Sequence, residues 1–110
     1  MAKYDTQLTG DFDDFLDYCI QEVLGGSFSA TLEEQSDFTL GDVRISVRIF
    51  ERYSMAGSNR LSLNLTLAGQ GRNLVLSAMT AGGSQATFFK MNTLGEHSFL
   101  NQFIRSVERY

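Results

Sequence analysis

The chain has no proline, no tryptophan and only one residue each of cysteine and histidine, Cys19 and His97. A lone cysteine excludes a disulfide within the chain, and a lone histidine excludes a metal site built from several histidines. No apolar run approaches the roughly 20 residues needed to cross a bilayer, and the first ten residues lack the apolar core of a signal peptide. We therefore expect a cytoplasmic protein with no metal, no cofactor and no membrane partner.

Basic residues are also scarce, since nine Lys and Arg stand against 13 Asp and Glu, for a formal net charge of −4. Binding to a phosphate backbone depends on Lys and Arg displacing counterions, so this charge opposes a nucleic-acid partner and an anionic membrane surface. The 110 residues are 43% hydrophobic and 12% aromatic. Such a chain is long enough to bury a core without a disulfide or metal, and we expect a single domain over residues 1–110.

Two segments have the apolar spacing of amphipathic helices. In residues 11–26 the apolar stripe consists of Phe12, Phe15, Leu16, Cys19, Ile20 and Val23. Thr9 or Asp11 can cap the start of this helix, and Gly25 and Gly26 can end it in a left-handed turn. Cys19 on the stripe is expected to be a buried structural thiol. The second helix has Phe99, Leu100, Phe103, Ile104 and Val107, and a capping-box signature at Thr93 and Glu96 places its start at Thr93.

Between these helices the apolar period changes to two, which is typical of strands. We expect strands over residues 28–32, 43–50, 61–67 and 74–80, a short first strand over 3–8, and a loop or hairpin in the polar residues 33–42. In 43–50 we assign Val43, Ile45, Val47 and Ile49 to the inner face, with Arg44, Ser46 and Arg48 on the outer face.

Strands that are apolar on one face favour an antiparallel sheet covered on one side. The predicted fold is therefore α+β, a single two-layer domain of order β-α-β4-α, in which a curved antiparallel sheet packs both helices on one face. This order resembles the TATA-binding-protein-like or helix-grip folds, some of which hold an apolar ligand between sheet and helix. Fold order alone does not establish a function.

The stretch T-A-G-G-S-Q-A-T-F-F-K, residues 80–90, is the strongest glycine-rich candidate for a ligand loop. A phosphate-binding loop needs a lysine directly followed by Ser or Thr at the start of a helix. Here Lys90 is not adjacent to the glycines, and residues 85–89 have the composition of further strand. We interpret the glycines as a bend in a strand, with a backbone-lined contact to a ligand as the alternative.

The outer face of the sheet is the other candidate site. Arg44, Ser46 and Arg48 are expected to share it with Ser62, Asn64 and Thr66 of the next strand. Guanidinium forks beside hydroxyls and an amide can bind an anion or carboxylate, or a second copy of the chain. Alternatively, the face is solvated and the arginines pair with acids such as Glu51. The candidate binding residues are Arg44, Arg48, Asn64, Ser84 and Gln85.

Over nearly the full chain, F-E-R-Y-S, N-R-L-S-L-N-L-T-L and S-A-M-T-A-G-G-S-Q-A-T-F-F-K-M-N-T-L-G-E resemble a family of small uncharacterised Firmicutes proteins. The resemblance implies a bacterial cytoplasmic domain and carries over no active-site residue. We expect a non-catalytic module that binds a small molecule or a protein partner and forms a homodimer. The alternative is a small enzyme with a polar site near Ser84, Gln85, Lys90 and His97.

Overall fold

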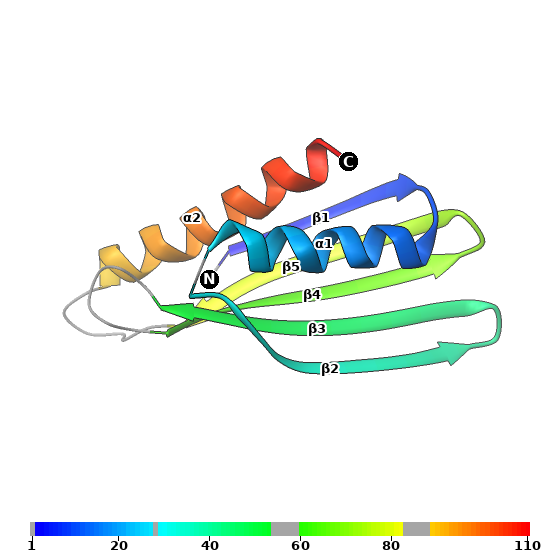
Figure 1. Ribbon diagram of the computed structural model, residues 1–110, viewed down its shortest axis with the longest axis horizontal. Coiled ribbons are helices and arrows are strands. Elements are labelled where there is room, and N and C mark those ends of the chain that lie inside the picture. Colours follow the sequence, from blue (N-terminus) through cyan, green and yellow to red (C-terminus); the bar gives the residue numbers. More distant parts are fainter. Residues whose placement is uncertain (1, 28, 54–59, 83–88) are drawn as a thin grey trace.

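The computed structural model describes residues 2–27, 29–53, 60–82 and 89–110, with the backbone alone for 89–97. Five strands and two helices lie in these residues, in the expected order β-α-β4-α (Figure 1). They are β1 (Ala2–Thr9), α1 (Phe12–Gly26), β2 (Thr31–Leu40), β3 (Val43–Tyr53), β4 (Arg60–Gln70), β5 (Asn73–Gly82) and α2 (Phe89–Glu108). Neither of these helices is long and apolar enough to cross a membrane.

All strand pairs in the described sheet are antiparallel, and the spatial order is β1-β5-β4-β3-β2. Strands β2 to β5 follow one another as a meander, with tight turns at residues 41–42 and 71–72. Gly41 and Gly71 open these turns with φ of 62° and 59°, a conformation that favours glycine. Strand β1 pairs with β5, so the first and last strands lie side by side and β2 is left at the other edge.

Helix α1 begins where its sequence predicts. The side chain of Asp11 caps it by accepting a hydrogen bond from the Asp14 backbone N–H at 3.0 Å. The predicted left-handed turn at Gly25 and Gly26 is wrong, because both residues stay helical and extended Ser27 ends the helix. The Gly26 carbonyl instead accepts a hydrogen bond from the Gln102 side chain of α2 at 2.6 Å. A side chain from the other helix thus satisfies a carbonyl that a glycine turn would otherwise satisfy.

The core lies between the two helices and one face of the sheet. It includes Phe12, Phe15, Leu16, Cys19 and Val23 of α1, Phe50 of β3, Leu61, Leu63, Leu65 and Leu67 of β4, Leu74, Leu76 and Ala78 of β5, and Phe99, Leu100 and Phe103 of α2. The expectation for Cys19 is confirmed, since it is 1% exposed. Burial raises the pKa of its thiol to about 12, so the thiolate needed for reactivity does not form at neutral pH.

The polar segment 33–42, which we predicted to be a loop or hairpin, forms most of strand β2. Every residue of β2 is exposed, and in Figure 1 this strand lies beyond the two helices at the edge of the sheet. A strand that contacts solvent on both faces needs no alternating apolar residues. The sequence of β2 therefore lacks the apolar alternation by which a half-buried strand is recognised.

Helix α2 starts earlier than the capping-box signature predicts. It begins at Phe89, so Thr93 lies inside the helix and the predicted start there is wrong. Phe89 is also helical where we predicted strand, while residues 85–88 of that predicted strand lie outside the described residues. A short apolar run such as Phe88-Phe89 suits either structure, and Lys90 and Met91 are good helix formers.

Cross-strand register decides which face each residue occupies. Ser46 lies opposite Leu67, Arg48 opposite Leu65 and Phe50 opposite Leu63, so these β3 side chains share the helix-covered face with the leucines of β4. Our assignment of β3 is therefore inverted. Its residues Val43, Ile45, Val47 and Ile49 share the opposite face with Asn64, Thr66 and Ala68. We call this second face, on the side away from the helices, the open face.

Candidate functional site

The structure separates the predicted binding residues. Arg44 and Arg48 lie on the helix side of β3, as do Ser46 and Phe50, whereas Asn64 lies on the open face opposite Ile49 and Met79. The predicted surface that combines the arginines with Asn64 is therefore wrong. Ser84 and Gln85 lie outside the described residues, as do the side chains of Lys90 and His97. The predicted polar site at these four positions remains a prediction.

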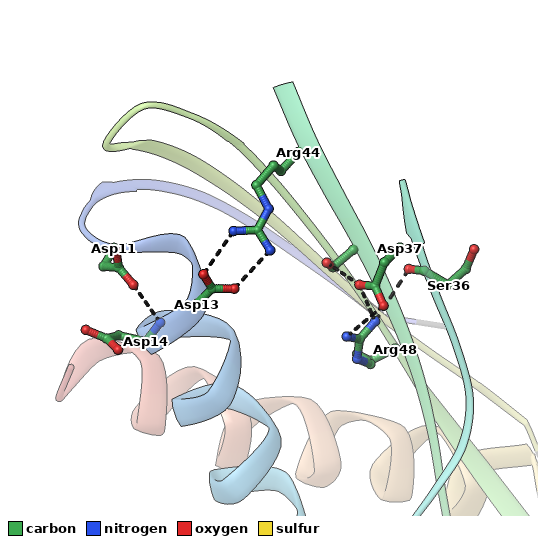
Figure 2. Close-up of polar contacts among 8 residues, drawn as sticks. Asp11, Asp13, Asp14, Ser36, Asp37, Arg44 and Arg48 are labelled. Carbon is green, nitrogen blue, oxygen red and sulfur yellow. Dashed lines mark hydrogen bonds and ion pairs between the residues drawn. The ribbon is translucent and has the colours of Figure 1, made fainter. Parts of the chain in front are cut away.

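Arg44 holds the beginning of α1 against β3. Its guanidinium donates two hydrogen bonds to the Asp13 carboxylate, at 3.0 and 2.9 Å (Figure 2). It also lies 4.2 Å from the centre of the Phe12 ring, within the range of a cation–π contact. The hydrogen bond from Arg44 lowers the pKa of Asp13. Because Asp13 is exposed, this pair positions the helix more than it stabilises the chain.

Arg48 is 7% exposed, although it was predicted to face solvent. Its Nη1 lies 2.9 Å from Asp37 Oδ1 of β2, and its Nη2 donates to Asp37 Oδ2 at 3.2 Å (Figure 2). Nη1 also donates to the backbone carbonyl of Val47 at 2.9 Å. Ser46 completes the cluster by donating to Asp37 Oδ1 at 2.5 Å. Of the guanidinium nitrogens, Nε alone has no hydrogen-bond partner among the described residues.

Both arginines are therefore occupied by carboxylates of this chain. We expected acids such as Glu51 as partners if the face was solvated, but the partners are Asp13 and Asp37, and Glu51 pairs with Arg60 at 2.6 Å. An anion that bound these arginines would have to displace a carboxylate already in place. Within the residues that the structure describes, no group of His, Cys, Asp or Glu side chains is arranged to hold a metal ion.

Between the helices there is a shallow hollow, lined by Glu22, Val23, Phe99, Gln102 and Phe103. Both ends of the Gln102 side-chain amide already make hydrogen bonds within the chain. Its nitrogen donates to the Gly26 carbonyl, and its oxygen accepts from Arg52 Nη1 at 3.2 Å. Arg52 also lies 4.2 Å from the centre of the Phe99 ring, and burial lowers its pKa. These contacts fasten β3 to both helices.

The open face carries a feature that the sequence analysis missed. Following the register across four strands, Phe38 of β2, Ile45 of β3, Ala68 of β4 and Val75 of β5 form one line, which we call the apolar row. Phe38 is 51% exposed and Val75 48% exposed. Further apolar side chains flank the row: Leu40, Val43, Val47, Ile49 and Met79.

Charged side chains on the open face lie toward its borders. At the β1 edge, Lys3 Nζ lies 3.5 Å from Asp5 Oδ2, and Ser77 donates to Asp5 at 2.6 Å. At the end of β3 and β4, Arg60 pairs with Glu51. The middle of the face carries apolar and small polar groups, including Asn64 and Thr66 of β4, while Ser62 lies opposite Glu51 at the border. A sheet face with an apolar middle, which neither of the described helices covers, is typical of a protein-binding surface.

The Asp37–Arg48 pair gives a pH-dependent contribution to stability. Hydrogen bonds from Ser46, and to a lesser extent from Arg48, hold the pKa of the Asp37 carboxyl below its ordinary value. Because the folded-state pKa is lowered, the contribution is present above about pH 4 and is lost as the pH falls through the folded value. We expect Asp37→Asn to lower the free energy of unfolding at pH 7 by about 1–2 kcal/mol. This is less than for a fully buried pair, because the Asp37 side chain is 55% exposed.

The measurement is urea unfolding of wild type and Asp37→Asn between pH 7 and pH 3. The difference between the two proteins should shrink below about pH 4. Asp17→Asn, which removes the same charge from an exposed position on α1, should cost less than about 0.5 kcal/mol at pH 7. Equal losses for the two variants would contradict a specific role for Asp37.

Comparison with known proteins places this chain in a family. Among solved structures, the chain is similar to the solution structure of Chr148 from Cytophaga hutchinsonii, a structural-genomics target, with 11% identity and a TM-score of 0.39. That match covers 97% of this chain and 91% of the other. The search of curated proteins finds no match. A family model described as a family of unknown function, DUF6054, matches residues 1–110, and the chain therefore belongs to that family.

Proposed function

We propose that the chain is a non-catalytic binding module that docks onto another protein through the open face of its sheet. The observation that carries this proposal is the apolar row, which crosses four strands and is left uncovered by the helices. Monomeric soluble proteins rarely expose contiguous apolar patches of more than a few hundred Å², and larger patches usually mark an interaction site.

Protein is the class of partner that this surface suits best. Small-molecule sites are concave and bury most of their ligand, whereas the open face is one side of an extended sheet. The net charge of −4 opposes nucleic acid and anionic lipid as partners. On the helix side, the guanidinium groups most suited to an anionic ligand already bind Asp13 and Asp37.

Site-specific photo-cross-linking tests the proposal. A photoreactive residue at Ser62, on the open face, should form a cross-link to protein in concentrated purified protein or in extract of its source cells. The same residue at Gln21, on the exposed surface of α1, should not. Val47→Lys, which puts a charge beside the apolar row, should abolish the Ser62 cross-link. Equal cross-linking from both positions, or none from Ser62, would overturn the proposal.

A further inference from the structure

We infer that the occupant of the open face is a second copy of the same chain, so that two sheets pack face to face about a two-fold axis. This inference rests on the proposed function and names its partner. Sheets that pack in this way lie about 10 Å apart, and the side chains of their inner faces interdigitate. Each copy would bury its own apolar row against that of the other.

The size of the open face agrees with a stable dimer. Five strands spaced about 4.8 Å apart, each roughly ten residues long at about 3.3 Å per residue, give a face of about 800 Å². Specific interfaces of standard size bury about 800 Å² per partner. A second copy that covered the whole face would therefore meet this size without a contribution from the helices.

Charge also favours self-association through this face. Most of the acids that make the chain net negative lie elsewhere, among them Asp11, Asp13, Asp14 and Asp17 at the beginning of α1. On the open face, Lys3 pairs with Asp5, and Arg60 pairs with Glu51. Arg60 also lies 3.7 Å from Glu33 of β2, and Glu34 is a further acid of β2 on this face, near its border. Two copies that cover the whole face would thus bring together mainly charges that are already paired within each copy, and the middle of the face would contribute no charge.

The exposed edge of β2 is the competing route to a dimer, but it is poorly suited to pairing with its own copy. Glu33, Glu34 and Asp37 lie along this strand, and the register with β3 shifts between Leu32 and Glu34. Acidic side chains and a bulge are features by which edge strands avoid pairing with one another. Pairing two β2 strands would also place acids of one copy close to those of the other.

Strand β4 provides space for such packing. Its open-face residues Ser62, Asn64, Thr66 and Ala68 are small or of medium size. Asn64 lies between Ile49 and Met79, and Ala68 lies between Ile45 and Val75, so each has a larger apolar side chain on both sides. Alternation of large and small residues lets facing layers interdigitate. The valines and isoleucines of β3 could also be present because β-branched residues favour strands. The experiment must therefore distinguish the loss of apolar surface from the loss of β-branching.

Sedimentation velocity of the full chain from about 1 to 100 µM tests the inference. We expect a dimer whose dissociation constant rises on the order of 100-fold in Val47→Lys, as for truncation of a central interface residue. Gln21→Lys makes the same charge change on α1 and should leave the dimer unchanged. The double variant Ile45→Thr/Val47→Thr keeps β-branching but loses apolar surface, so it should weaken the dimer as well.

Ser62→Lys guards against a variant that simply misfolds, because Ser62 is already polar and only half-buried. It should weaken the dimer while the circular dichroism spectrum stays that of wild type. A monomer at all concentrations, or a dimer insensitive to all the open-face variants, would overturn the second-copy inference. If the monomer still cross-links to a different protein from Ser62, the proposed function survives; if it cross-links to nothing, both fail.

Discussion

Replacing Phe15 by alanine is expected to lower the free energy of unfolding by about 3–5 kcal/mol, the range for truncating a buried phenylalanine. Phe15 is fully buried on α1. Its ring meets that of Tyr110 edge-on, with 4.9 Å between the ring centres. The cavity would open where α1, the end of the chain and the sheet meet. The strands are hydrogen-bonded to neighbours on both sides and cannot move in to fill the cavity. The packing energy lost with the ring is therefore not recovered by relaxation.

The measurement is urea unfolding followed by far-ultraviolet circular dichroism, at one fixed protein concentration because self-association shifts apparent stability. Leu32→Ala is the matched comparison, since Leu32 is a large apolar residue on the helix side of β2 that is 37% exposed. It should cost about 1 kcal/mol or less. A loss for Phe15→Ala as small as that for Leu32→Ala would contradict the described packing of α1.

The period of the apolar residues was enough to predict most elements of this fold. The stripe from Phe12 to Val23 formed the predicted helix, and the alternating leucines of β4 point to the core as expected. Both patterns are informative because leucine and phenylalanine at regular intervals are explained by burial and by little else. The predicted order of the elements is confirmed, but the bounds of β2 are not, because that strand was expected over residues 28–32 and covers Thr31–Leu40.

The faces of β3 could not be predicted in the same way. Its Val and Ile residues were assigned to the core, yet they lie on the open face, and Arg48 lies among buried residues. β-Branched residues suit a strand on either face. An arginine can be buried when its guanidinium donates hydrogen bonds to a carboxylate, as Arg48 does to Asp37. Period two fixes which residues share a face but not which face is covered.

One signal in the sequence bears on the correct face, but it becomes decisive only when the register is known. The next strand of the hairpin alternates leucine with Ser62, Asn64 and Thr66, so its covered face is unambiguous. Register with that strand places Arg48 opposite Leu65. The connection between the two strands is too long for its turn type to fix this register from sequence, so the sequence does not exclude Asn64 from the face that carries the arginines.

Replacing Gly82 by alanine is the last large effect we expect, about 2–4 kcal/mol of lost stability. Gly82 ends β5 with φ of +134°, which disfavours a side chain. A Cβ atom there would lie 2.6 Å from the carbonyl oxygen of Arg60 on β4. Because the obstacle is backbone held in the β4–β5 ladder, it cannot move aside as a flexible side chain would. Thermal and urea unfolding measure the loss.

Gly71→Ala is the control that separates strain from collision. Gly71 has φ of +59° in the turn before β5, but an added Cβ would meet no atom within 4 Å. It should therefore show only the conformational cost, about 1–2 kcal/mol. A greater loss for Gly82→Ala would mean that the first glycine of the T-A-G-G stretch is needed for the close approach of β4 and β5. Equal losses would show instead that the backbone conformation alone requires glycine there.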